Sequence, residues 1–307
     1  MMIFWQQVIN GLTLGSIYAL VALGYTMVYG IMELINFAHG DVVMIGALIA
    51  LSTTQWLMTQ GFPLTSALIV AFGLSVFICM ILGYLIEKVA YRPLRSAPKL
   101  APLITAIGLS LLLQQLASLI WGKGYLPFPG NIGELTLAWH GLVVSTLQLS
   151  IFVLSLLFML LLWQLIHHTK LGRAMRATAQ SVPFAQLMGV NTDRVISQTF
   201  ILGSALAAVA GVMDVIYYSV GNYTMGFLLG LKAFTAAVLG GIGNLKGAML
   251  GGVLLGVVEA LGAGYIGDLT HGLFGSNYKD VFAFFVLILV LIFKPNGLLG
   301  GKTQEKV

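Results

Sequence analysis

The stretch PLTSALIVAFGLSVFICMILGYLI, from Pro63 to Ile86, carries no charged side chain. A helix needs roughly 20 apolar residues to cross about 30 Å of hydrocarbon, so this stretch predicts a transmembrane helix. The sequence therefore predicts an all-α, polytopic membrane protein with about 8 to 10 transmembrane helices, two of them short enough to be re-entrant. The apolar runs lie near residues 7–29, 42–58, 63–86, 100–121, 147–168, 195–218, 228–243, 246–266 and 280–293.

The composition excludes a soluble protein. Of the 307 residues, 59% are hydrophobic and 8% are charged, whereas soluble domains are about 45–50% apolar and about 25% charged. Apolar runs continue from Ile3 to Phe293 without a soluble-sized stretch between them, so we expect residues 1–307 to form a single transmembrane domain. No Lys or Arg precedes the first apolar run, so no cleaved signal peptide is expected.

The basic residues predict which loops face the cytoplasm. The loops Lys88–Lys99 and Lys170–Arg194 hold four basic residues each, and the tail after Phe293 holds three. By the positive-inside rule these regions are cytoplasmic, and the C-terminus with them. Since this topology explains the net charge of +5, we expect no nucleic-acid partner. The loops Gly122–Thr146 and Ser219–Gly230 hold one basic residue and none, which predicts the opposite side, and the side of the N-terminus stays open.

Two interruptions break the helical pattern, one in each half of the chain. INFAHGD (Ile35–Asp41) is polar, and VLGGIGNLKGAMLGG (Val238–Gly252) is rich in glycine. A helix interrupted at membrane depth exposes backbone groups that only protein or a watery cavity can satisfy. These breaks favour a translocation pathway or gate, and their placement suggests a weak internal repeat. The candidate pathway residues are Asn36, His39, Asp41, Gly240, Gly243 and Asn244.

The polar residues of the first break also have a structural interpretation. An Asn or Asp side chain there is expected to cap the helix that restarts after the break. His39 and Asp41 are spaced i, i+2 and do not share a helical face, and Cys79 is the only cysteine, so no metal site is expected. Overlapping the end of the second break, GAMLGGVLLG (Gly247–Gly256) stacks small residues four apart, which predicts close packing of two helix backbones.

Three charged residues lie inside apolar runs: Asp214, Lys232 and Glu259. A bare charge at that depth costs at least a few kcal/mol, so each must be paired, hydrated or functional. Asp214 either reaches the outer membrane interface or belongs to a buried pair. Lys232 can pair with either acid, and residues of this kind would also suit a proton-coupled carrier.

Catalysis by this chain is not expected, and no catalytic residue is assigned. The tail NGLLGGKT (Asn296–Thr303) resembles a phosphate-binding loop. However, Asn296 stands where the first glycine is required, and no strand precedes it. We therefore expect the chain to bind no nucleotide or other cofactor.

The loop from Thr169 to Val195, TKLGRAMRATAQSVPFAQLMGVNTDRV, is too ordered for a simple connector. Gly172–Gln180 is compatible with a helix, Ser181 can cap a second one, and Gly189 can close it. The second helix would present a small apolar face with Arg residues nearby. Such a segment suits docking to a cytoplasmic partner, or else lies on lipid headgroups. The candidate coupling residues are Arg173, Arg176, Phe184, Leu187, Met188 and Gly189.

At this loop the chain resembles the permease subunits of the branched-chain amino acid ABC importer family, and its H-type members most closely. The similarity extends over essentially the whole chain. The matching blocks are GRAMRA (Gly172–Ala177), GVN (Gly189–Asn191), NGLTLGSIYALVALGYTMVYGI (Asn10–Ile31), INFAHGD, AFTAAVLGGIGNLKGAMLGG (Ala233–Gly252) and KPNGLLG (Lys294–Gly300).

The resemblance implies a multi-pass permease that imports leucine, isoleucine and valine across a bacterial inner membrane. It further implies a second related permease, with a heterodimer favoured over a homodimer, and two cytoplasmic ATPases that bind ATP and Mg²⁺. An extracytoplasmic binding protein would deliver the substrate, and the loop around 169–195 would be the coupling element. Permeases for urea or short amides look similar over these blocks and remain an alternative, as does a proton-coupled secondary carrier.

Overall fold

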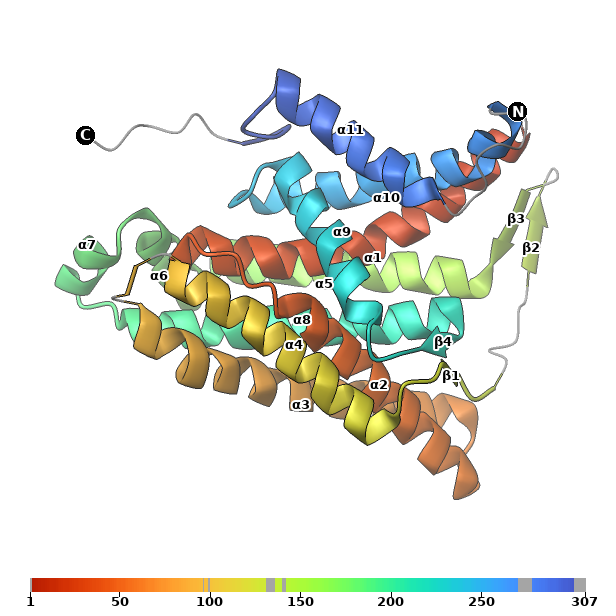
Figure 1. Cartoon of the computed structure of the whole chain (residues 1–307), viewed down its shortest axis with the longest axis horizontal. Coiled ribbons are helices and arrows are strands. Elements are labelled where there is room, and N and C mark those ends of the chain that lie inside the picture. The colour runs from red at the N-terminus through yellow and green to blue at the C-terminus, as the bar shows by residue number, and fades with distance from the viewer. Residues whose placement is uncertain are drawn as a thin grey trace.

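The computed structural model describes residues 2–95, 97–98, 100–130, 136–139, 142–269 and 278–300, and its helices pack against one another with several of them inclined to the longest axis (Figure 1). Lys99 and the tail from Gly301, which includes Lys302 of the phosphate-loop resemblance, lie outside the described residues. The long helices are α1 (Met2–Met32), α2 (His39–Thr59), α3 (Leu64–Leu85), α4 (Leu100–Trp121), α5 (Thr146–His168), α8 (Thr192–Tyr218), α9 (Met225–Gly240), α10 (Leu245–Leu269) and α11 (Lys279–Phe293).

Each apolar run expected from the sequence corresponds to one of these helices. Within the described part of the chain, seven helices are long and apolar enough to cross a membrane. The other two, α9 and α11, have 16 and 15 residues, which agrees with the expectation of two short segments. The chain is therefore a polytopic all-α membrane protein.

Short elements gather at the two ends of the helix array. One end holds the π-helical turn η1 (Ile86–Tyr91), the 3₁₀ turn η2 (Arg92–Leu94) and two short helices, α6 (Lys170–Gln180) and α7 (Val182–Leu187). The opposite end holds the antiparallel strand pairs β1 (Leu126–Pro127) with β4 (Val220–Gly221) and β2 (Thr136–Trp139) with β3 (Leu142–Ser145).

The strand pairs were not foreseen from the sequence, and they help to place the N-terminus. The Gln6 side chain donates to the carbonyl of Val143 at 2.8 Å and accepts from its amide at 3.0 Å. The N-terminus therefore lies at the strand end, and the last described residues lie toward the α6–α7 end (Figure 1).

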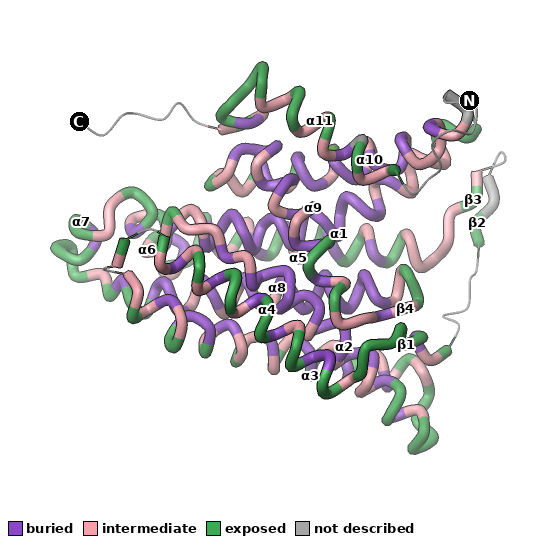
Figure 2. The backbone as a smooth tube through the Cα atoms, in the orientation of Figure 1, coloured by how far each residue is buried: buried purple, intermediate pink, exposed green. Residues whose placement is uncertain are grey.

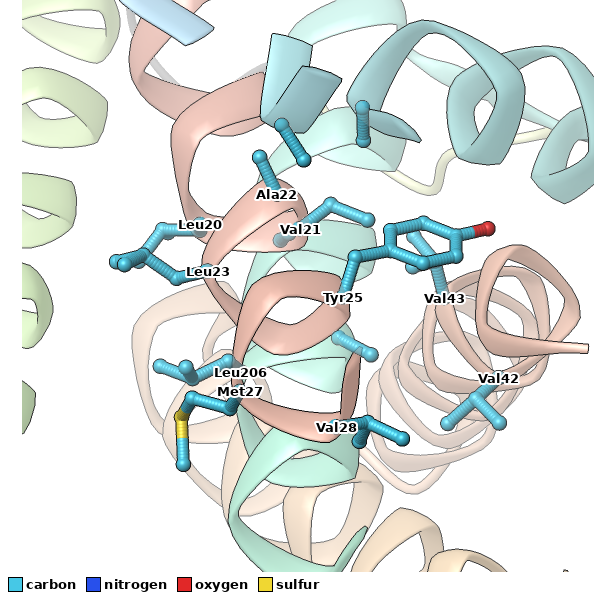
Figure 3. Close-up of a cluster of buried hydrophobic side chains, with 14 of the residues drawn as sticks. Leu20, Val21, Ala22, Leu23, Tyr25, Met27, Val28, Val42, Val43 and Leu206 are labelled. Carbon is cyan, nitrogen blue, oxygen red and sulfur yellow. The ribbon is translucent and has the colours of Figure 1, made fainter. Parts of the chain in front are cut away.

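Helix α1 forms the centre of the structure. It is buried along most of its length, as are much of α2 and α8, whereas α3, α4 and α5 have many exposed residues (Figure 2), and large apolar residues are among them. Large side chains of α1 such as Leu20, Leu23 and Met27 pack between the neighbouring helices (Figure 3). An apolar outer surface is unfavourable in water and suits contact with lipid.

The predicted close packing of small residues is confirmed between α1 and α10. A Cβ added at Gly15 would lie 2.7 Å from the Cα of Val253, and one at Gly252 would lie 2.5 Å from the Cα of Ala19. Only glycine allows two helix backbones to approach this closely, which supplies van der Waals contact where lipid removes the hydrophobic driving force.

Candidate functional site

The loop after α5 forms the helical hairpin that the sequence predicts. Thr169 caps α6 through the amide of Gly172, and the Ser181 hydroxyl accepts from the amide of Phe184 at the start of α7. Gly189 closes the hairpin with φ +81°, a left-handed conformation that favours glycine. We refer to α6 and α7, residues 170–187, as the coupling hairpin, after the role that the sequence predicts for this segment.

The apolar face predicted for α7 is present and uncovered in the isolated chain. Phe184, Leu187 and Met188 are 71%, 80% and 83% exposed. Large apolar side chains exposed this fully on an end of the molecule indicate a contact surface for a partner or for lipid.

The coupling hairpin is held firmly to the end of α5. Gly172 lies directly against the backbone of Ile166, and Met175 and Thr178 are buried on the same face of α6. Arg173 and Arg176 are both exposed, and the guanidinium of Arg176 donates to the carbonyl of Ile166. Arg176 therefore anchors α6 rather than offering a free charge.

The first helix break is real and partly buried, since Asn36 and Ala38 are buried whereas Glu33 is exposed. Residues 33–38 are not helical, and α2 begins at His39, deep beside Gly24 of α1. The expected capping role of Asn or Asp is wrong, because the N-cap position is Ala38 and no side chain caps α2. The Oδ1 atom of Asn36 instead accepts a hydrogen bond from the Tyr91 hydroxyl at 2.9 Å.

His39 and Asp41 face different neighbours, in agreement with their spacing. The His39 ring packs against the Tyr25 ring with centroids 4.7 Å apart, while Asp41 Oδ1 accepts from the Gln114 amide at 3.0 Å. Among the residues that the structure describes, no cluster of His, Cys, Asp or Glu side chains could hold a metal ion.

The second break is a tight turn between α9 and α10. Gly241 and Gly243 have φ of +104° and +90°, which explains the need for glycine. Asn244 caps α10 by accepting from the amide of Lys246 at 3.1 Å, and its amide group donates to the carbonyl of Leu299 at 2.8 Å.

The segment after α11 closes this turn. Two amides of KPNGLLG, those of Leu298 and Leu299, donate to the carbonyls of Leu239 and Gly240 at 2.8 and 3.0 Å. The last two carbonyls of α9 are therefore bonded to another part of the chain, and the break is sealed by backbone hydrogen bonds.

The structure brings the two breaks together against one helix. His39 lies beside Gly24 of α1, and Gly243 lies beside Gly30. Six residues of helix separate these contacts by about 9 Å along α1. A small cavity between the breaks is lined by Tyr25, Tyr29, Ile35, Phe234, Ala237 and Ile242.

The intramembrane charges also cluster, and the structure decides the pairing of Lys232. Its ammonium group lies 2.8 Å from Glu259 Oε1 and 2.6 Å from a carboxylate oxygen of Asp280. Glu259 also accepts from the Tyr18 hydroxyl at 2.9 Å and pairs with Lys279 at 3.4 Å. This network joins α1, α9, α10 and α11.

Asp214 lies in the last turns of α8 but is buried inside the protein, and in the described part of the chain it does not form one of the ion pairs of Lys232. Asp214 is 5% exposed. Its Oδ1 atom has no hydrogen-bond partner among the described residues.

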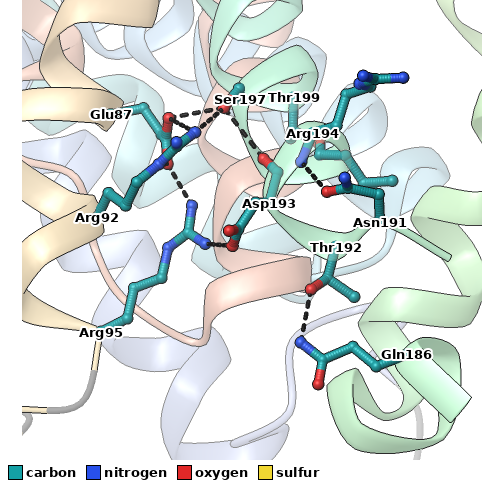
Figure 4. A network of polar contacts seen from close by, with 11 residues as sticks. Glu87, Arg92, Arg95, Gln186, Asn191, Thr192, Asp193, Arg194, Ser197 and Thr199 are labelled. Carbon is teal, nitrogen blue, oxygen red and sulfur yellow. Dashed lines mark hydrogen bonds and ion pairs between the residues drawn. The ribbon is translucent and has the colours of Figure 1, made fainter.

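Sequence reasoning missed Glu87, which is fully buried at the end of α3. Its carboxylate accepts from the Ser197 hydroxyl at 2.7 Å and pairs with the guanidinium groups of Arg92, at 3.1 Å, and of Arg95 (Figure 4). Arg95 also pairs with Asp193. The sequence did contain a signal for this ion pair, because Glu87 directly follows a charge-free run and precedes two arginines. In the sequence analysis, only the basic residues of this loop were used, to predict its side of the membrane.

Known proteins match this chain over nearly all of its length. The permease BraD of the high-affinity branched-chain amino acid transport system of Pseudomonas aeruginosa is 48% identical over 99% of this chain and 98% of its own length. LivH, named for the same kind of system in Escherichia coli K12, is 46% identical over the same shares. The ribose import permease RbsC of that organism is 25% identical over 95% of this chain and 86% of its own length. The family model described as the permease component of branched-chain amino acid transport systems matches residues 7–291, and the chain belongs to this family.

Proposed function

We propose that this chain is the membrane-spanning permease subunit of an ABC importer for leucine, isoleucine and valine. The observation that carries the proposal is the 46–48% identity, over 99% of the chain, to two permeases named for high-affinity branched-chain amino acid transport. The interrupted, glycine-packed helices support transport by alternating access, because interrupted backbone at membrane depth is tolerated only inside protein or beside a watery cavity, and a small cavity lies between the two breaks.

The proposed complex contains a second related permease, as a heterodimer or a homodimer, two cytoplasmic ATPases and an extracytoplasmic binding protein. The ATPases bind ATP and Mg²⁺ and perform hydrolysis, and this chain binds no cofactor and is not an enzyme. The exposed face of Phe184, Leu187 and Met188 supports ATPase docking at the coupling hairpin. Burying one aromatic side chain contributes on the order of 2 kcal/mol.

We place the chain in a bacterial inner membrane with the coupling hairpin and the C-terminus in the cytoplasm. The four basic residues of each of the two loops at that end support this orientation. The N-terminus lies at the strand end of the molecule and is then extracytoplasmic.

The translocation route is proposed to pass between the two helix breaks. The supporting observation is that Ile35 from the first break and Ile242 from the second line one small cavity beside Tyr25. In another conformational state this cavity would widen into the route.

The proton-coupled alternative is weakened by the charge network. Lys232 and Glu259 bond each other and further partners from two more helices, as expected of a structural network. Removing one partner of a buried ion pair costs about 3–5 kcal/mol, which explains why such pairs are retained without any transport role.

The test is uptake by the reconstituted complex, with the ATPases, second permease and binding protein from the same organism in proteoliposomes. We expect ATP inside the vesicles to drive leucine uptake, with competition by isoleucine and valine but not by urea or acetamide. Competition by urea or acetamide would favour the amide alternative. Uptake that follows a proton gradient without ATP would favour the secondary carrier.

A further inference from the structure

We propose that the π-helical turn η1 is the relay by which the coupling hairpin moves the first helix break, and that Glu87 and Tyr91 are its positioning residues. The inference rests on the proposed function as an ABC permease. The turn is six residues long, and its two ends bond to the two regions that have to communicate. π-Helical turns are rare and occur frequently at functional sites.

The first end of η1 is fixed to the start of α8, directly after the coupling hairpin. Glu87 accepts from Ser197 of α8, and Arg95 bridges Glu87 and Asp193 (Figure 4). The preceding residue, Thr192, accepts from the Gln186 side chain of α7 at 2.9 Å. A displacement of α7 is therefore transmitted through side-chain bonds to the carboxylate of Glu87.

The contact between Glu87 and the start of α8 is hard to break because the carboxylate of Glu87 is buried. The carboxylate is fully shielded from solvent and bonds Arg92, Arg95 and Ser197 at once. Separating a buried carboxylate from its partners is costly. The turn therefore follows the start of α8 instead of breaking away from it.

The other end of η1 contacts the first helix break. Tyr91 is buried, and its hydroxyl donates to Asn36 in the non-helical segment 33–38. The Tyr91 ring also packs against Phe200 of α8, with centroids 5.3 Å apart. The Asn36 side chain does not cap α2. In the described part of the chain, its hydrogen bond with Tyr91 connects the first helix break to η1.

The experiment measures uptake and ATP hydrolysis in parallel on the full reconstituted complex. Tyr91→Phe removes only the hydroxyl that reaches Asn36. We expect leucine uptake per ATP hydrolysed to fall about fivefold, which is the factor that corresponds to the loss of one buried hydrogen bond. The amount of ATPase that copurifies with the permease should not change. Ser75→Ala is the matched control, because it removes a buried bond of 2.7 Å to Gly46 that joins α3 to α2 away from η1. Its uptake per ATP should stay at the wild-type value.

A second readout reports movement of the break itself. Ala38→Cys in a Cys79→Ser background should change its reactivity toward a small polar thiol reagent between nucleotide-free and ATP-bound states. Tyr91→Phe and Glu87→Gln should both reduce that change, whereas Ser75→Ala should not. If Tyr91→Phe matches Ser75→Ala in uptake per ATP and in thiol response, the relay is wrong. If the wild-type complex transports no branched-chain amino acid, the proposed substrate fails, but the thiol response to ATP still decides the relay.

Discussion

At the break before α2, no side chain caps the restarting helix, whereas at the break between α9 and α10 Asn244 caps α10 and the segment after α11 bonds the last carbonyls of α9. The first break is linked through the Tyr91 hydroxyl to a turn that contacts the N-terminal end of α8. The second is closed by backbone hydrogen bonds. Under the proposed function, this difference predicts that the first break moves during transport and that the second forms a fixed wall of the route.

The largest effect is expected at the sealed turn. In Gly241→Val, a Cβ would lie 2.5 Å from the amide nitrogen of Gly300, at a φ of +104°. Gly243 has a similar φ, but a Cβ added in Gly243→Val would meet no atom within 4 Å. Strain alone costs about 1–3 kcal/mol, so both variants should lower the unfolding temperature of the purified complex, and Gly241→Val more. Equal losses would mean that the C-terminal segment does not seal the turn.

The next largest effect concerns the hairpin that would drive the first break. Phe184→Ala should weaken ATPase copurification or uncouple hydrolysis from uptake, because it removes on the order of 2 kcal/mol of apolar contact. Arg173→Gln is the control, since exposed ion pairs contribute about 0–1 kcal/mol. Arg176 is unsuitable as a control because it bonds Ile166. Unchanged uptake, hydrolysis and copurification in Phe184→Ala would place the contact elsewhere, with residues 91–99 as the next candidate.

A smaller effect is expected from the cap of the second break. Asn244→Ala should lower the free energy of unfolding by about 1 kcal/mol, the usual value of an N-cap. Asn244→Asp retains the accepting oxygens and should lose less. Neither variant should alter the nucleotide response of a cysteine at position 38. A changed response would show that the second break also moves.

The smallest effect is expected from two single-cysteine variants in a Cys79→Ser background, whose thiol reactivities are compared with and without nucleotide. Ala38→Cys should react differently with and without nucleotide, whereas Ile242→Cys should react to the same extent in both states. Position 242 is preferable to Gly243, whose positive φ strains any side chain. Inertness at both positions in every state would place these residues in packed protein and remove the route between the breaks.

Local sequence features were sufficient for the helices and the coupling hairpin. The apolar runs set the number of apolar helices, because backbone hydrogen bonds in lipid must be satisfied within each segment. Ser181 and Gly189 marked the limits of α7 because capping and positive φ involve neighbouring residues only. The small residues Gly247–Gly256 also predicted a close helix contact, although not its partner α1.

Contacts between distant residues were decided by the tertiary structure alone. Asn36 looked like a cap but bonds Tyr91, 55 positions away, and Glu87 bonds Ser197, 110 positions away. The choice of Glu259 and Asp280 over Asp214 as partners of Lys232 depends on how each helix is rotated about its axis. That rotation is set by packing against several neighbours at once, as where Gly15 and Gly252 bring α1 and α10 together, and a pattern along one segment does not contain it.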